Sequence, residues 1–243
     1  MSARGFYDKG AFPFTDLLES SHPAIKEELL GVLHRKRWSG YLDHDPRLGR
    51  AMLFLLYVRG RPNRRNCRLC PTTASVLAAI PNLSQAVFAF LPPGARIAPH
   101  RGAPGILRVH LGVLAEGTGA GWKSEGATEL CVEGKVTIFD DGSLHEAWND
   151  GSRPRVTLVC DPPAPVADES DLARTLRAYE GRYGAGYLLR TYGKSKAPSH
   201  PFNRMALPAL LSMERAAALA EPLLLPPILF GYNHLVARHA PAR

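Results

Sequence analysis

The feature that most constrains the fold is a series of short β-type segments between residues 85 and 161. Each segment is rich in Val, Ile, Leu, Phe and Thr, and Gly or Pro separates it from the next. No helical periodicity lies between them, which is typical of an antiparallel sandwich or barrel. The predicted strands are Ala86–Leu91, Ile106–Val113, Thr128–Val132, Lys135–Phe139 and Arg155–Cys160.

The segment Ile106–Val113 also predicts what each face of its strand carries. Successive side chains of a strand point to opposite faces, so alternate residues share a face. The apolar residues alternate from Leu107 to Val113, whereas Arg108 and His110 lie between them. One face of this strand is therefore expected to join a core, and the other to be basic.

Helical patterns flank the β region. Helical spacing runs from residue 13 to residue 33, and Pro23 after two serines indicates a helix start. A polar turn at 43–46, a buried strand at 51–58 and a short helix at 72–80 follow.

After the prolines at 162–165 the pattern is helical again, and from Met205 it is rich in Leu, Ala and Pro. We predict a mainly β domain at 1–165 and a helical C-terminal extension at 166–243. The extension would pack on the barrel as a lid or serve as a homodimer interface.

Charge narrows the possible partners. Lys and Arg number 30 against 22 Asp and Glu, and the net charge of +8 favours an anionic partner. Residues 59–68 hold five arginines, which form either a solvated loop or a grip on an acidic substrate, a phosphate or an acidic carrier protein. No nucleic-acid-binding motif accompanies this charge, so we expect no nucleic-acid partner.

The sequence also bears on the cellular compartment of the protein and on whether it holds a structural zinc ion. Its most apolar stretch, 222–233, contains three prolines and is shorter than the roughly 20 residues that a membrane span needs. The N-terminus lacks the pattern of a signal peptide. Four cysteines form a single C-x-x-C pair, too few for a structural zinc site of recognisable spacing. We predict a cytoplasmic protein with reduced thiols and no transmembrane segment.

Histidines in the β region indicate a different metal chemistry. Non-haem iron oxygenases hold Fe(II) with two histidines and one carboxylate, which leaves positions open for a co-substrate and O₂. In barrel enzymes of this kind the carboxylate follows the first histidine by two residues, and a later basic residue binds 2-oxoglutarate. His100, His145 and Arg155 occur in this order, and Gly102 occupies the carboxylate position.

With the motifs around these residues, the chain resembles the aspartyl/asparaginyl β-hydroxylase family of Fe(II)- and 2-oxoglutarate-dependent oxygenases, which also includes lipid A hydroxylases. The resemblance extends from about Phe12 to Pro162. The motifs that carry it are Phe12-Pro13-Phe14, Cys70-Pro71-x-Thr73, Leu91-Pro92-Pro93-Gly94, Pro99-His100-Arg101-Gly102, Leu107-Arg108-Val109-His110-Leu111-Gly112, Glu133-Gly134-Lys135, Phe139-Asp140-Asp141, His145-Glu146-x-Trp148-Asn149 and Arg155.

The resemblance implies a double-stranded β-helix, a jelly-roll or cupin-like barrel, that binds Fe(II), 2-oxoglutarate and O₂. It implies that His100 and His145 are the only protein ligands of the iron, because Gly102 brings no carboxylate. Asp141 would act beside them by orienting a water or a ligand histidine.

The resemblance also assigns residues to the co-substrate. Arg155 would bind the far carboxylate of 2-oxoglutarate, while Arg108 and His110 would contact the co-substrate or a neighbouring carboxylate. Ala89 stands where the family has a serine that helps to bind 2-oxoglutarate.

The implied reaction is hydroxylation of an unactivated C–H bond. The leading substrate is the β-carbon of an aspartyl or asparaginyl unit, whether free, peptidic or carrier-bound. Three alternatives remain open at this point: a lipid acyl-chain hydroxylase, a halogenase with chloride at the open Gly102 position, and a non-catalytic metal-binding barrel, which Ala89 keeps open.

Overall fold

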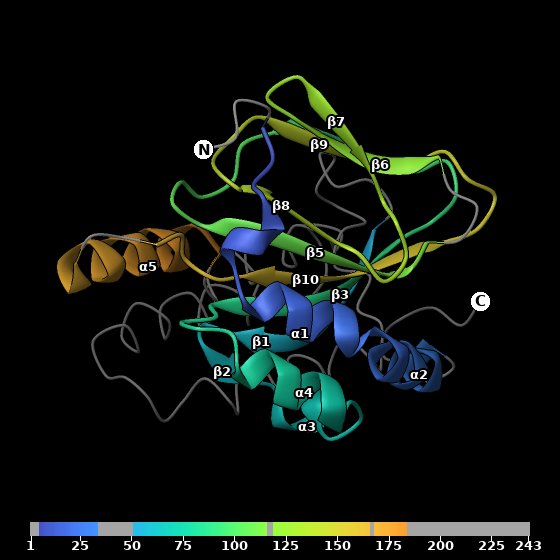
Figure 1. Cartoon of the computed structure of the whole chain (residues 1–243), viewed down its shortest axis with the longest axis horizontal. Helices are drawn as coiled ribbons and strands as arrows, with labels where there is room; N and C mark the ends of the chain where they lie inside the picture. The colour runs from blue at the N-terminus through green and yellow to red at the C-terminus, as the bar shows by residue number, and fades with distance from the viewer. Residues whose placement is uncertain (1–4, 34–50, 116–118, 166–167, 184–243) are drawn as a thin grey trace, which may run out of the picture. The chain divides into compact units, whose positions relative to one another are not determined.

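The computed structural model describes residues 5–33, 51–115, 119–165 and 168–183 (Figure 1). Two antiparallel sheets form the centre: a large one with the order β2-β1-β3-β10-β5-β8 and a small one with the order β4-β9-β6-β7. The strands are β1 (Met52–Val58), β2 (Arg61–Pro62), β3 (Gln85–Leu91), β4 (Arg96–His100), β5 (Leu107–Leu114), β6 (Ala120–Ser124), β7 (Ala127–Leu130), β8 (Val136–Asp140), β9 (His145–Asn149) and β10 (Arg155–Asp161). The helices are η1 (Lys9–Ala11), α1 (Phe14–Ser20), α2 (His22–Leu33), α3 (Arg64–Cys67), α4 (Pro71–Ala78) and α5 (Glu169–Tyr183).

The pairing of the last eight strands defines the fold. They pair in a nested order: β3 with β10, β4 with β9, β5 with β8 and β6 with β7. From the outermost pair to the innermost, successive pairs lie alternately in the large and the small sheet. The eight strands thus form one long antiparallel ribbon that is rolled into a barrel. This order is that of a jelly roll, and the predicted double-stranded β-helix is confirmed.

Most of the predicted elements are present in the structure. Each of the five predicted strands of the β region is present, with ends within two residues of those predicted. The strand predicted at 51–58 is β1, and the helix predicted at 72–80 is α4. Because α2 begins at His22, Pro23 stands in its first turn as predicted.

Four strands were not predicted: the two-residue edge strand β2 of the large sheet, and β4, β6 and β9 of the small sheet. These three strands of the small sheet are five residues long and interrupt their apolar residues with Pro, Gly, Lys or Glu. Strand β4 tolerates Pro99 because it lies at the edge of its sheet, where a missing N–H costs no ladder hydrogen bond. Their pairing partners, rather than local propensity, make these segments strands.

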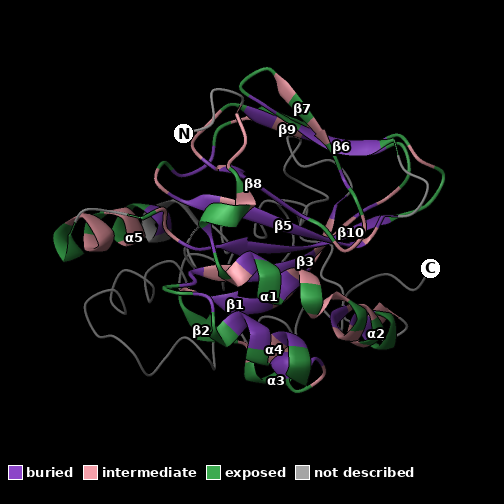
Figure 2. Ribbon diagram, in the orientation of Figure 1, coloured by how far each residue is buried: buried purple, intermediate pink, exposed green. Residues whose placement is uncertain are grey.

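The main hydrophobic core lies between the large sheet and the N-terminal helices (Figure 2). Leu18 of α1, Ile25 and Leu29 of α2 and Leu77 of α4 are fully buried there. The alternating apolar residues of β5 pack in the same cluster, as predicted. Each such side chain contributes about 1.5–3 kcal/mol on burial, so this layer holds the large sheet in place.

The other face of β5 is turned toward the small sheet. It carries Arg108 and His110, as the alternation predicts, and the small sheet covers it. A smaller apolar cluster that includes Trp122, Phe139 and Ala147 lies between the sheets. The barrel interior therefore combines aromatic side chains with buried polar and charged ones.

Helix α5 follows the barrel and is fastened to it by Tyr179, whose hydroxyl donates a hydrogen bond to Asp161. The barrel, the N-terminal helices and α5 as far as Arg182 form one compact unit. The border proposed between 165 and 166 stays a prediction. The predicted turn at 43–46, the tail at 222–233 and the proposed dimer interface lie outside the described residues. Among the described helices, none is long and apolar enough to cross a bilayer.

Candidate active site

Two histidines meet at one end of the small sheet. His100 ends β4 and His145 begins β9, and antiparallel register places them directly opposite each other. Their ring centroids are 4.2 Å apart. His145 is 6% exposed and His100 is half-buried. Neighbouring strands thus bring together two imidazoles that are 45 residues apart in the sequence (145 − 100).

Backbone carbonyls determine which nitrogen of each ring is available. Nδ1 of His100 lies 2.9 Å from the Ala98 carbonyl, and Nδ1 of His145 lies 2.8 Å from the Ser143 carbonyl. A carbonyl only accepts, so Nδ1 carries the proton and Nε2 the lone pair. Burial, and then His100 and Arg108, lower the pKa of His145 to about 4, so its ring is neutral at neutral pH. These are the tautomer and charge that a metal ligand requires.

The carboxylate of Asp141 occupies the space beside Gly102. A Cβ atom on Gly102 would lie 1.9 Å from Asp141 Oδ2, so residue 102 has no room for a side chain. The Asp141 carboxylate accepts hydrogen bonds from the Ala103 N–H and from Arg108 Nη2, both at 2.6 Å. Its Oδ1 lies 3.8 Å from His145 Nε2. A carboxylate therefore adjoins the histidine pair, although it comes from residue 141.

Arg108 connects this carboxylate to a second one. Its Nη2 pairs with Asp141, and its Nε lies 3.2 Å from Asp161 Oδ1. Both carboxylates are buried. Burial raises the pKa of Asp161, and the nearby Arg108 guanidinium opposes this effect. Arg108 thus sits between two acidic groups on the inner face of the large sheet.

A buried arginine that pairs with no carboxylate of the described residues lies between the sheets. Arg155 begins β10 and is 2% exposed, with its guanidinium carbon 4.8 Å from the ring centroid of Trp122. Its Nη1 donates a long hydrogen bond of 3.4 Å to the Gly121 carbonyl, and its Nε has no hydrogen-bond partner. Within the described part of the chain, no carboxylate pairs with it.

The charge of Arg155 nevertheless persists. Burial lowers its pKa to about 10, which leaves the guanidinium cationic at neutral pH. A buried cation without a partner is costly, because its lost hydration is not replaced. This position therefore favours a bound anion, and the planar guanidinium suits a carboxylate.

His110 is held beside this arginine by aromatic rings. Its ring centroid is 4.8 Å from Trp122 and 5.6 Å from Phe139, and its Nδ1 lies 3.3 Å from Thr157 Oγ1. Burial, and then Arg155 and Arg108, hold the pKa of His110 well below its usual range. The ring is therefore a neutral hydrogen-bonding group inside the barrel.

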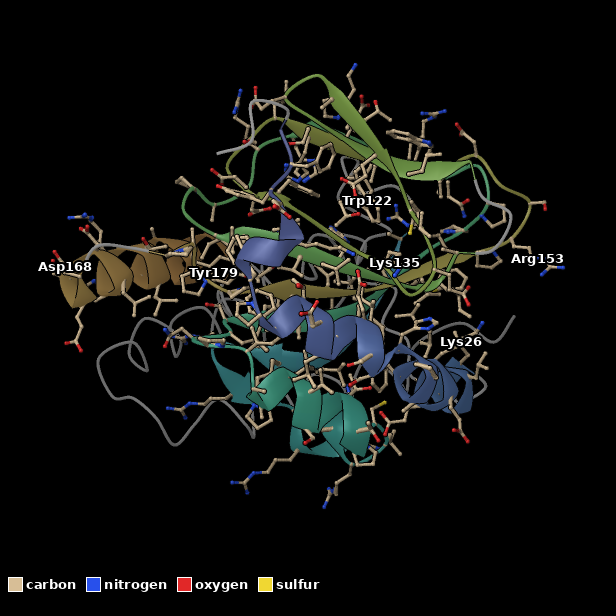
Figure 3. All side chains as sticks on the ribbon, viewed as in Figure 1. Lys26, Trp122, Lys135, Arg153, Asp168 and Tyr179 are labelled. Atoms are coloured by element: carbon tan, nitrogen blue, oxygen red, sulfur yellow. The ribbon has the colours of Figure 1, made fainter. Side chains whose placement is uncertain are left out.

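Two residues of this interior were not predicted from the sequence. Trp122 lies between the sheets with a buried, unpaired Nε1–H (Figure 3), and it was missed because β6 was not predicted. Thr157 is fully buried two residues after Arg155, so strand alternation alone was a sufficient signal for it. Thr157 is the register partner of Ala89, and it brings a hydroxyl next to the position that lacks one.

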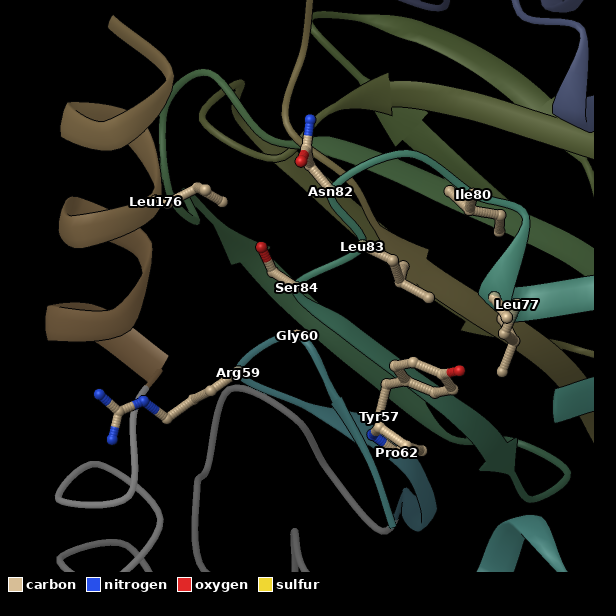
Figure 4. Close-up of a pocket in the computed structure, with 11 residues that line it drawn as sticks. Tyr57, Arg59, Gly60, Pro62, Leu77, Ile80, Asn82, Leu83, Ser84 and Leu176 are labelled. Atoms are coloured by element: carbon tan, nitrogen blue, oxygen red, sulfur yellow. The ribbon is translucent and has the colours of Figure 1, made fainter. Parts of the chain in front are cut away.

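A separate cavity of about 470 Å³ lies elsewhere, between β1, the end of α4 and α5 (Figure 4). Tyr57, Arg59, Asn82 and Leu176 are among the residues that line it, and none of the predicted site residues does. Arg59 is the one arginine of the 59–68 segment that reaches it. The histidine pair and this cavity are therefore distinct places in the fold.

The comparisons with known proteins identify the family. A model of the aspartyl/asparaginyl β-hydroxylase family matches residues 19–165. The chain belongs to this family. The resemblance inferred from the motifs is thereby confirmed.

Two relatives illustrate the range of the family. The ornithine lipid ester-linked acyl 2-hydroxylase of Rhizobium tropici is 33% identical over 165 residues, which cover 64% of this chain and 59% of that protein. The aspartyl/asparaginyl β-hydroxylase of Homo sapiens is 31% identical over 153 residues, which cover 59% of this chain and 20% of that protein. The chain thus spans less than two thirds of either relative.

Among solved structures, a Pseudomonas putida prolyl-4-hydroxylase superposes with a TM-score of 0.43 at 15% identity, over 68% of this chain and 95% of that chain. The fold assignment itself rests on the nested strand order.

Proposed function

We propose that this protein is an Fe(II)- and 2-oxoglutarate-dependent dioxygenase that hydroxylates an unactivated C–H bond. The observation that carries the proposal is the pair formed by His100 and His145, two adjacent imidazoles whose Nδ1 atoms are held by backbone carbonyls. The described residues contain no group of three His, Cys, Asp or Glu side chains arranged to hold a metal. The two histidines would thus be the protein ligands.

The surrounding residues suit the bound groups. His100 and His145 would hold the iron, and Asp141 would orient a ligand beside them. Arg155 would bind a carboxylate of 2-oxoglutarate, with the aromatic rings around it excluding water. When bound, iron and 2-oxoglutarate supply the oxidant: O₂ is consumed, one oxygen atom enters the C–H bond, and succinate and CO₂ are released.

The names of the relatives suggest a common substrate chemistry. An acyl 2-hydroxylase and an aspartyl/asparaginyl β-hydroxylase both act on a methylene carbon that is bonded directly to a carbonyl or carboxyl carbon. We propose this kind of methylene as the target. The leading substrate is an aspartyl or asparaginyl unit, free, peptidic or carrier-bound, and the five arginines of residues 59–68 would suit an acidic carrier protein.

A lipid acyl chain is the second candidate. It is favoured by the match to the Rhizobium tropici enzyme, which covers slightly more of this chain than the human match does. The two candidates differ in what must enter the barrel, a short polar unit or one end of an acyl chain.

The remaining alternatives receive less support. A halogenase would need chloride near Gly102, where the Asp141 carboxylate already lies, and two negative charges at that distance repel each other. A non-catalytic barrel does not need a buried cation such as Arg155, which pairs with no carboxylate among the residues that the structure describes. Both observations favour hydroxylation.

The test is to prepare the protein without oxygen, add Fe(II) and O₂, and measure succinate formed from 2-oxoglutarate. The panel contains aspartyl and asparaginyl peptides, carrier-bound aspartate and ester-linked acyl lipids. We expect iron-dependent succinate that one substrate class stimulates, with a product that gains one oxygen atom by mass spectrometry. No succinate with any of them, together with no binding of 2-oxoglutarate, would contradict the proposal.

Gly102→Ala tests whether the position of the Asp141 carboxylate beside the histidines matters to metal binding. The new Cβ would meet the Asp141 carboxylate, so Asp141 must move away from its partners. Loss of an outer partner of a metal ligand typically costs 10–100-fold in metal affinity, and we expect a decrease of about tenfold or more. Isothermal titration with Co(II) measures it.

Gly31→Ala is the matched control, because a Cβ on Gly31 meets nothing within 4 Å. It should bind Co(II) as the wild type does. Unchanged affinity in Gly102→Ala would show that the position of Asp141 does not matter to the metal.

A further inference from the structure

One side chain connects helix α5 to the barrel interior. Tyr179 is 3% exposed, and its hydroxyl donates a hydrogen bond of 2.5 Å to Asp161 Oδ2. Its label in Figure 3 marks the point where α5 approaches the strands. Residue 179 lies outside the segment matched by the family model, residues 19–165. The contact therefore joins the matched segment to a residue that lies beyond it.

Asp161 depends on that hydroxyl. The carboxylate is 1% exposed, and among the described side chains only Tyr179 donates a hydrogen bond to it. Its other oxygen lies 3.2 Å from Arg108 Nε as an ion pair. A buried carboxylate keeps one orientation only if its oxygens have partners, so Tyr179 determines how Asp161 faces Arg108.

The path continues to the histidines. Arg108 reaches in the other direction with Nη2, which lies 2.6 Å from Asp141 Oδ1. That oxygen lies 3.8 Å from His145 Nε2. Since the guanidinium is planar and rigid, holding its Nε side restricts where its Nη2 can point. Four consecutive contacts thus lead from α5 to the candidate metal ligands.

We infer that Tyr179 is a positioning residue of this site: through Asp161 and Arg108 it holds the Asp141 carboxylate beside the histidine pair. The inference rests on the proposed function, because it assigns the Asp141 carboxylate a task at the metal. It follows that the working unit of this protein includes helix α5.

Tyr179→Phe is the decisive variant, because it keeps the buried ring and removes only the hydroxyl. We expect its dissociation constant for Co(II), measured by titration calorimetry, to rise about fivefold or more. Loss of a direct outer partner of a metal ligand typically costs 10–100-fold, and Tyr179 acts at a greater distance. Asp161→Asn removes the charge that faces Arg108 and should give a loss in the same direction. Tyr57→Phe is the matched control, since Tyr57 is buried at the separate cavity, and its affinity should stay unchanged.

A double-mutant cycle separates positioning from general loosening of the fold. If Tyr179 acts through Asp141, the effect of Tyr179→Phe should vanish in an Asp141→Asn background, because coupled residues are not additive. Equal effects in both backgrounds would overturn the inference. Wild-type Co(II) affinity in a folded Tyr179→Phe protein would also overturn it. If Tyr179→Phe does not fold, wild-type Co(II) affinity in Asp161→Asn would overturn it instead.

The proposed function fails by a different result. If the wild type binds neither Co(II) nor 2-oxoglutarate, the function is wrong. If the wild type binds both and Tyr179→Phe binds Co(II) equally well, only the role of Tyr179 is wrong.

Discussion

Replacing His145 by alanine is expected to abolish metal binding and 2-oxoglutarate turnover. One of two imidazoles would be lost from a site at which no third ligand of the described residues compensates. Because the loss of a mere outer partner already costs 10–100-fold, the loss of a ligand should lower metal affinity by more than about a hundredfold. His100→Ala should behave in the same way. Titration with Co(II) and succinate formation measure the two effects.

The control is His22→Ala. His22 lies on α2, where its Nε2 contacts the Val113 carbonyl, away from the histidine pair. Its removal should leave metal affinity unchanged. Normal turnover in His145→Ala or His100→Ala would refute the assignment of the metal ligands.

Replacing Arg155 by alanine should leave the metal bound and lower the affinity for 2-oxoglutarate. The guanidinium is the buried cation that has no carboxylate partner among the described residues. Hydrogen bonds to charged groups are worth about 1.5–3 kcal/mol each, so losing a two-bond contact should raise the 2-oxoglutarate dissociation constant about a hundredfold or more. Arg155→Lys should recover part of this loss, since lysine keeps the charge but not the planar fork.

Arg153→Ala is the comparison, because Arg153 precedes the same strand and is exposed, as Figure 3 shows. It should bind 2-oxoglutarate like the wild type. If Arg155→Ala also kept wild-type affinity, the anion site would have to be sought elsewhere in the chain.

All strands of the large sheet except the two-residue β2 were predictable because they satisfy a local rule. In β5, alternate apolar residues pack against the helices and the intervening ones face the barrel interior, as the pattern requires. Three strands of the small sheet, β4, β6 and β9, do not follow that rule, whereas β7 was predicted. Strands β4 and β9 carry the histidines and other polar residues, and their extended conformation comes from pairing with each other.

The candidate site was also predictable in part. His100, His145 and Arg155 stand at motif positions, and their spacing along the chain is readable without coordinates. That the Asp141 carboxylate occupies the space beside Gly102 could not be predicted from the sequence. The short distance between these two residues depends on how two loops approach each other. Trp122 had no motif and no predicted strand to mark it.

The sequence by itself determined the barrel class, the family and the identity of most candidate site residues, because these depend on alternation and on motifs within short stretches of chain. The tertiary structure decided three things: that Asp141 fills the space beside Gly102, that Arg155 is buried over Trp122 with no carboxylate partner in the described part of the chain, and that Tyr179 of α5 donates a hydrogen bond to Asp161. The physical reason is common to all three. Each contact joins residues far apart in the sequence, and only strand register and the packing of distant segments bring such residues together.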